Sequence, residues 1–128
     1  MYADSTFSSF FDRSMEFTSV MYEYRAYVEK VYDGDTITVD IDLGFDVVLH
    51  GQKIRLVRIN APEVRGEQRE SGIKTRDALR ERILNKWIKI KTQKDKKGKY
   101  GRWLGEIWID EECINDWLLS EGLAEVYK

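Results

Sequence analysis

The spacing of apolar residues changes twice along this chain, and these changes restrict the fold more than any other feature. Apolar and polar residues alternate from Tyr24 to Ile41, as in strands with one buried face, and Asp33-Gly34 in their midst predicts a tight hairpin turn. Residues 67–85 repeat apolar positions at helical spacing, and alternation returns over residues 87–92. A basic, glycine-containing loop is expected at residues 94–101, before a further strand at residues 103–109. The chain is therefore expected to form strands, then one amphipathic helix, then strands again.

Shorter segments complete the predicted domain. Leu43–Leu49 is a weaker third run, and His50-Gly51-Gln52 predicts a turn before the strand that starts at Ile54. Residues 114–118 have the spacing of a short second helix, which Gly122 is expected to end. Five twisted strands, an inserted helix and a short C-terminal helix predict an α+β domain built on a Greek-key β-barrel of the OB-fold type.

The chain length of 128 residues, 42% of them hydrophobic, suffices for one domain with its own core. We assign residues 23–128 to this domain and residues 1–22 to an N-terminal extension. Four apolar residues of the extension would share one face of a short helix: Phe7, Phe10, Phe11 and Met15. This face is expected to pack on the domain's own surface or to fray, and the alternative is an arm that binds a partner. We expect a monomer.

The chain has too few cysteines and histidines to form a zinc site. The single cysteine, Cys113, excludes an internal disulfide, and with one histidine, His50, the chain lacks the ligands of a zinc site. Both residues are predicted to be structural or incidental. Any metal would be bound by oxygen atoms, the ligands that calcium, magnesium and manganese prefer.

The sequence contains no signal for a membrane. No apolar run approaches the length of a membrane span, and the start Met1-Tyr2-Ala3-Asp4 lacks the basic region of a signal peptide. We therefore expect a cytoplasmic protein that does not associate with membranes.

Charge is strongly segregated along the chain, although the net charge is only -2. Residues 53–102 hold 17 of the basic side chains and 6 of the acidic ones. A local basic face can bind an anionic partner whatever the overall balance, as nucleic-acid-binding proteins do. A solvated surface rich in charges is the simpler interpretation of the same pattern.

The stretch Ile54–Glu63 carries the groups that phosphate chemistry requires. It is predicted to be a strand that ends in a turn, because Pro62 cannot continue a central strand. Oxygen donors lie at the end of this strand, at Asn60 and Glu63, and in the Asp33–Asp35 turn. Guanidinium groups match phosphate bidentately, and the candidates are Arg55, Arg58 and Arg102, although any one of them could form an ordinary surface ion pair.

Three ordered segments of the chain resemble the signature of the staphylococcal nuclease (thermonuclease) family. They are Asp33-Gly34-Asp35-Thr36, the stretch from Arg55-Leu56 to Ile59-Asn60-Ala61-Pro62-Glu63, and Lys99-Tyr100-Gly101-Arg102. The resemblance covers about residues 24–126, and three motifs in order are more specific than any one. It implies an OB-fold nuclease that cleaves phosphodiester bonds in single-stranded DNA or RNA with calcium, leaving 3′-phosphates; magnesium and manganese are the other candidate cations.

The resemblance also implies a role for each matching residue. Asp35 corresponds to a metal-binding carboxylate, and Asp33 to an acid that supports the site through water. Arg55 and Arg102 correspond to the arginines that hold the scissile phosphate. Glu63 corresponds to the carboxylate that orients or deprotonates the attacking water.

Two residues depart from the family pattern. Asn60 stands where the family has a metal-binding Asp, and Ala61 stands where the best-known member has Thr, so that Ala61 could ligate only through its backbone carbonyl. An amide oxygen ligates calcium without adding negative charge, so we expect weaker cation binding than in the family. The alternative is therefore a nucleic-acid-binding OB-fold module that has lost turnover.

Basic and aromatic residues near the third motif are expected to contact the nucleic acid. The lysines would attract the backbone in a salt-dependent way, and an aromatic ring could stack on a base. The candidates are Lys94, Lys96, Lys97, Lys99, Tyr100 and Trp103.

Overall fold

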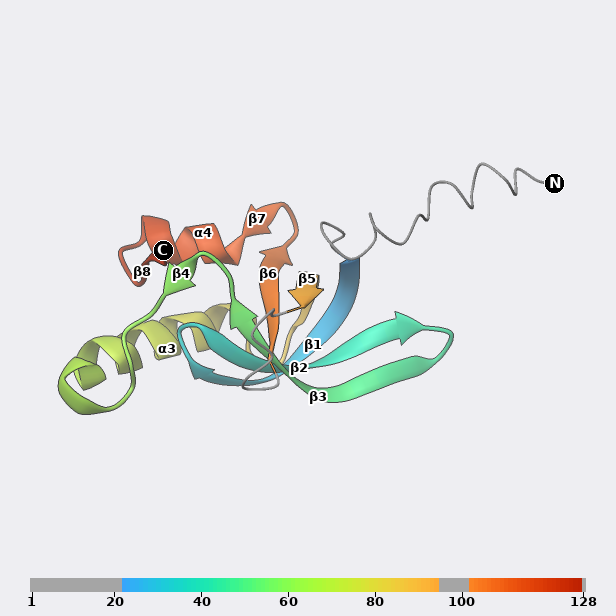
Figure 1. Ribbon diagram of the computed structural model, residues 1–128, viewed down its shortest axis with the longest axis horizontal. Coiled ribbons are helices and arrows are strands. Elements are labelled where there is room, and N and C mark those ends of the chain that lie inside the picture. Colours follow the sequence, from blue (N-terminus) through green and yellow to red (C-terminus); the bar gives the residue numbers. More distant parts are fainter. Residues whose placement is uncertain (1–21, 95–101, 128) are drawn as a thin grey trace.

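A computed structural model describes residues 22–94 and 102–127 of the chain (Figure 1). The N-terminal extension up to residue 21 lies outside the described residues, and β1 (Tyr22–Asp33) begins at the first of them. Within this described part, no helix is long and apolar enough to cross a membrane.

Five strands close into a barrel. These strands are β1, β2 (Thr36–Gly44), β3 (Val47–Leu56), β5 (Trp87–Lys94) and β6 (Trp103–Ile109). Antiparallel pairs give the order β3-β2-β1-β5-β6, and a parallel pair between β3 and β6 joins the two ends. The predicted five-stranded barrel is confirmed.

Smaller elements surround the barrel (Figure 1). A 3₁₀ turn (η1, Gly66–Gln68) leads into α3 (Arg69–Ile83), which is the predicted inserted helix. The strand β7 (Glu112–Cys113) extends the sheet beside β6, and α4 (Ile114–Ser120) is the predicted short C-terminal helix. The strands β4 (Ile59–Asn60) and β8 (Glu125–Val126) pair as a separate two-stranded sheet.

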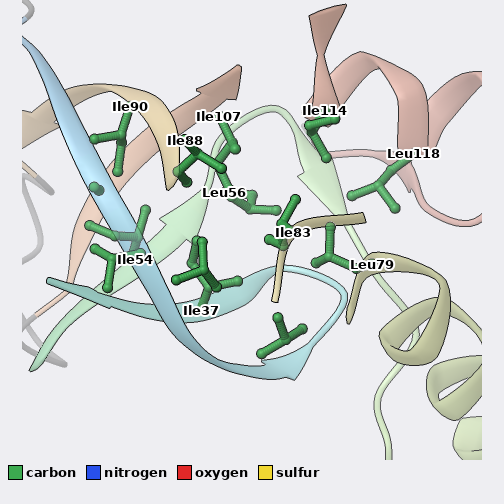
Figure 2. Close-up of a cluster of buried hydrophobic side chains, with 14 of the residues drawn as sticks. Ile37, Ile54, Leu56, Leu79, Ile83, Ile88, Ile90, Ile107, Ile114 and Leu118 are labelled. Carbon is green, nitrogen blue, oxygen red and sulfur yellow. The ribbon is translucent and has the colours of Figure 1, made fainter. Parts of the chain in front are cut away.

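Isoleucine, leucine and valine side chains from the inner faces of the strands form the core (Figure 2). Leu79 and Ile83 of α3 and Leu118 of α4 complete it, and all three are fully buried. The left-handed backbone of Asn85 follows the end of α3, and that of Gly122 follows the end of α4, as the sequence predicted for Gly122. The two helices therefore lie against the barrel through the apolar faces seen in the sequence.

Two predicted boundaries were wrong. His50-Gly51-Gln52 is not a turn but lies inside β3. Gly51 has a φ of 66°, and its N–H donates to Asp40 Oδ1 at 2.9 Å. The positive φ belongs to an irregularity in the pairing of β2 with β3, so the strand continues through this glycine. The turn lies instead at Phe45-Asp46. The strand predicted to continue from Ile54 breaks after Leu56, where Arg58 has a φ of 69°.

Candidate active site

The carboxylate of Asp35 joins two of the three segments that carry candidate site residues. Asp35 lies just before β2, is only 8% exposed, and accepts a hydrogen bond from the backbone N–H of Ala61 at 3.0 Å. The hydroxyl of Thr36 donates to its other oxygen at 3.3 Å. A buried carboxylate requires such partners, so this contact fixes the Ala61 backbone beside Asp35.

Arg55 lies next to this carboxylate. Its Nη2 is 3.6 Å from Asp35 Oδ2, and its Nη1 donates to the carbonyl of Leu56 at 2.7 Å. Only 14% of the Arg55 side chain is exposed. The strand register explains the approach, because Arg55 pairs with Thr36, the residue after Asp35. These contacts fix the orientation of the Arg55 guanidinium, whose planar group can bind phosphate through two hydrogen bonds.

Gly34 allows the acidic turn to approach the rest of the site. A Cβ atom at this position would collide with the side chain of Thr75 on α3 and would lie 2.6 Å from the Ala61 Cβ. Thr75 is itself fixed, since its hydroxyl donates to the carbonyl of Leu123 at 2.7 Å. The Asp33–Asp35 turn therefore packs against both Ala61 and the helix because residue 34 has no side chain.

Asp33 is the second carboxylate of the turn. Its Oδ1 accepts the backbone N–H of Asp35 at 3.0 Å. Burial, then a side-chain hydrogen bond with Asp35 and the negative charge of Asp35, raise the pKa of Asp33 to about 6. The two carboxylates are thus close enough to interact.

Asn60 and Glu63 flank Ala61-Pro62 in the sequence. Asn60 is exposed and pairs across the small sheet with Glu125 of β8. Glu63 is also exposed, and its backbone N–H donates to Gln68 Oε1 at 3.3 Å. A Cβ atom at Gly72 of α3 would collide with the carbonyl of Glu63, so this glycine allows the helix to approach the Glu63 backbone.

Arg102 immediately precedes β6 and is half-buried. Because β6 runs parallel to β3, with Leu104 opposite Arg55, the backbone of Arg102 enters the fold beside the strand that carries Arg55. Trp103 is 37% exposed. Lys94 is the last residue of β5, and its side chain is not described. Four other predicted nucleic-acid contacts lie outside the described residues: Lys96, Lys97, Lys99 and Tyr100.

Comparison with known proteins identifies the kind of domain that holds these residues. The model of the family described as "Staphylococcal nuclease homologue" matches residues 53–128. The chain belongs to the staphylococcal nuclease family. The match includes Arg55, Asn60, Glu63 and Arg102, and it begins after the Asp33–Asp35 turn.

Curated relatives agree with this family. The chain is 31% identical over 100 residues to a thermonuclease of Staphylococcus intermedius and to one of Staphylococcus hyicus, covering 76% of this chain and 56% of each relative. It is 30% identical over 115 residues to Protein ParB of Escherichia coli, covering 83% of this chain and 59% of that protein. The chain thus spans a little over half the length of these relatives.

Among the arginines considered from the sequence, Arg58 of this family member lies elsewhere. Its Nη1 donates to Asp116 Oδ1 at 2.6 Å, and its Nη2 donates to Glu106 Oε2 at 3.3 Å. The hydrogen bond with Asp116 raises the pKa of Arg58 further. Arg58 therefore forms surface ion pairs on the α4 side of the barrel, the alternative that the sequence left open for any single arginine.

Sequence reasoning missed two residues, Tyr127 beside Arg55 and the buried Asn115 of α4. Tyr127 lies with its ring centroid 5.4 Å from the Arg55 guanidinium, and its backbone N–H donates to the Arg58 carbonyl at 3.0 Å. None of the three sequence motifs includes Tyr127. Asn115 is fully buried in α4, where it accepts from Ile107 N–H and donates to the carbonyls of Val57 and Gly105. No sequence pattern distinguishes it from a surface asparagine.

Within the described residues, no three His, Cys, Asp or Glu side chains group together as a metal site. Oxygen donors of mixed kind lie at or next to the Asp35–Ala61 contact: the carboxylates of Asp33 and Asp35, and the amide of Asn60, which precedes Ala61 in the sequence. Oxygen donors of this mixed kind suit calcium better than a transition metal. The residues present therefore fit a calcium ion in donor type.

Proposed function

We propose that this chain is a metal-dependent nuclease that hydrolyses phosphodiester bonds in single-stranded DNA or RNA. Membership of the staphylococcal nuclease family and the resemblance to two thermonucleases support this proposal. The observation that carries it is the direct approach of Asp35 to both Arg55 and Ala61, because it joins a candidate cation ligand to a candidate phosphate clamp.

Calcium is the proposed cofactor. Asp35, Asn60 and the Ala61 carbonyl would hold the ion, and Asp33 would support it through water. When bound, calcium supplies positive charge beside a non-bridging phosphate oxygen. Magnesium or manganese would be the substitutes, since both also prefer oxygen ligands.

The side chains around that position have separate proposed roles. Glu63, which is exposed, orients a water or takes its proton. Arg55 and Arg102 stabilise the extra negative charge of the pentacovalent transition state, and donors fixed in advance contribute about 3–4 kcal/mol each in comparable sites. Expulsion of the 5′-oxygen would leave a 3′-phosphate.

A binding module without turnover is the second candidate. Asn60 favours it, because the amide contributes no charge to a site in which affinity depends on the number of charged ligands. Glu63 favours catalysis instead, since a protein that only binds phosphate gains nothing from a carboxylate near it. The cleavage assay below separates the two candidates.

The test incubates end-labelled single-stranded DNA and RNA with the protein and calcium, magnesium, manganese or a chelator. We expect both substrates or one of them to be cleaved, and the chelator to abolish this cleavage. Arg102→Ala or Glu63→Ala should reduce the cleavage rate by about 100-fold or more. Arg25→Ala is the matched control, because Arg25 is an exposed arginine paired with Asp42 at 3.8 Å and over the Trp87 ring. Retention of full activity in both site variants would contradict these roles, and salt-dependent binding without cleavage would support the binding module.

A further inference from the structure

The outer parts of β2 and β3 leave the barrel as a two-stranded arm, residues 41–49 (Figure 1). Apolar side chains of this arm are unusually exposed: Leu43 is 39% exposed, Val47 50% and Leu49 41%. Phe45 at the tip is 99% exposed. Contiguous exposed apolar side chains on a strand pair mark an interaction surface.

Two of these side chains, Val47 and Leu49, share the face that continues from the core. Ile41 is buried in the core and pairs with Leu49, so both side chains lie on the inner face. Strand alternation places Val47, two residues from Leu49 along β3, on the same face, while Leu43 lies at an irregularity of the pairing between Asp42 and Gly44. We call Val47 and Leu49 the inner face of the arm. Asp42 pairs with Val48 on the opposite face, so this carboxylate does not interrupt the apolar surface.

The described chain begins at the edge of this inner face. Ala26 of β1 pairs with Ile41, and alternation places Tyr24 and Tyr22 on the inner side in turn. The Tyr22 and Tyr24 rings stack with centroids 6.4 Å apart, and Tyr22 is 55% exposed. Residues 1–21 therefore join the fold beside the inner face.

We infer that residues 1–21 pack on the inner face of the arm within the same chain. Their apolar positions, Phe7, Phe10, Phe11 and Met15, fit one face of a short helix. The link of residues 16–21 can span about 20 Å, at about 3.3–3.6 Å per residue. The arm extends only about 10 Å beyond the Arg25–Asp42 pair, three residues at about 3.4 Å each.

A second copy of the chain could offer the same apolar residues to the arm. The tethered segment is favoured because a short linker holds it at an effective concentration of the order of millimolar, above that of a second copy in dilute solution. This inference is independent of the proposed nuclease activity. Residues 1–21 would then cover the outer ends of β2 and β3. The opposite ends of these two strands carry Thr36 and Arg55, beside the candidate site.

Disulfide trapping in the full-length chain tests the inference. The variant Phe11→Cys with Leu49→Cys is oxidised with glutathione disulfide at several protein concentrations, and native Cys113 is kept because it is buried. Phe11→Cys with Val48→Cys is the matched control, since residues 48 and 49 are 44% and 41% exposed but face opposite sides. We expect an intrachain disulfide, independent of concentration, that forms at least about fivefold faster in the first pair, because access controls exchange.

Equal rates in the two pairs, or no disulfide in either, would overturn the inference. A disulfide between chains that grows with concentration would also overturn it and would indicate a second copy on the arm. Hydrogen exchange provides a second readout without cysteines. Phe10→Ser with Phe11→Ser should speed exchange of amides 43–49 at least about threefold relative to Ser9→Asn, and unchanged exchange would contradict the inference.

Discussion

Asp35 and Ala61 lie 26 residues apart in the sequence and are joined by one buried hydrogen bond of 3.0 Å, from the Ala61 N–H to Asp35 Oδ2. This bond connects the turn between the first two strands to the segment that follows β4. Because Arg55 lies 3.6 Å from the same oxygen, a single carboxylate organises both sides of the candidate site. The stability of the site depends on the hydrogen bond of Asp35, and its cation affinity depends on the charge of the same carboxylate.

Replacement of Asp35 should separate the hydrogen bond from the charge. Asp35→Asn keeps an oxygen acceptor for Ala61, so it should fold normally and lose calcium affinity. Asp35→Ala leaves the Ala61 N–H unpaired, which costs about 1–3 kcal/mol of unfolding free energy. Urea unfolding and calorimetric calcium titration measure the two effects. Equal stability of the two variants would mean that the bond to Ala61 does not hold the site together.

Asn60→Asp should tighten calcium binding, because it restores a charged ligand. Without the cation, the new carboxylate lies opposite Glu125 on the paired strand, and like charges in that position destabilise a sheet. We therefore expect a lower melting temperature in chelator and a larger rise on calcium addition than in the natural chain. Differential scanning calorimetry with and without calcium checks this, with Asn60→Gln as the uncharged control. An unchanged calcium affinity would show that residue 60 is not a ligand.

Gly72→Ala should push the Glu63 backbone away from α3, because the added methyl group would collide with the Glu63 carbonyl. Alanine normally favours a helix over glycine by about 1 kcal/mol, so a loss of stability would reveal the collision. We expect destabilisation of about 1–3 kcal/mol, the usual cost of overpacking, with slower cleavage. Ser71→Ala, at an exposed neighbouring position, is the control for urea unfolding. A stabilised Gly72→Ala chain would contradict the close contact.

Stability should depend on the ionisation of Asp33. Burial and the neighbouring Asp35 raise the pKa of Asp33 from 3.8 to about 6 in the folded protein. The folded state therefore binds a proton more tightly than the unfolded state, so this contribution is favourable at low pH and is lost as the pH rises from about 4 to 6. Urea unfolding in chelator across this range should show the decrease, and Asp33→Asn should remove it. A parallel pH profile in the variant would assign the effect to another group.

Sequence patterns predicted most of the fold because its elements rely on local signals. Alternation defined the barrel strands, helical spacing defined α3 and α4, and Asp33-Gly34 marked the first turn. The errors arose where one residue adopts a backbone conformation that its local sequence does not predict. Gly51 reads as a turn residue, but here its positive φ forms an irregularity within β3, and Arg58 breaks a strand although arginine rarely adopts a positive φ.

The sequence by itself determined the barrel, the two helices and the chemical types available for a site, because periodicity and motif order are properties of the chain. Only the tertiary structure decided which groups meet. Arg55 and Arg58 lie three residues apart in one basic stretch, yet strand register aims Arg55 at Asp35, while the break after Leu56 leaves Arg58 paired with Asp116. The contacts of Tyr127 with Arg55 and of Gly72 with the Glu63 backbone likewise join residues far apart in the sequence. Such contacts depend on the closure of the barrel and on close approach at glycine, which no local pattern encodes.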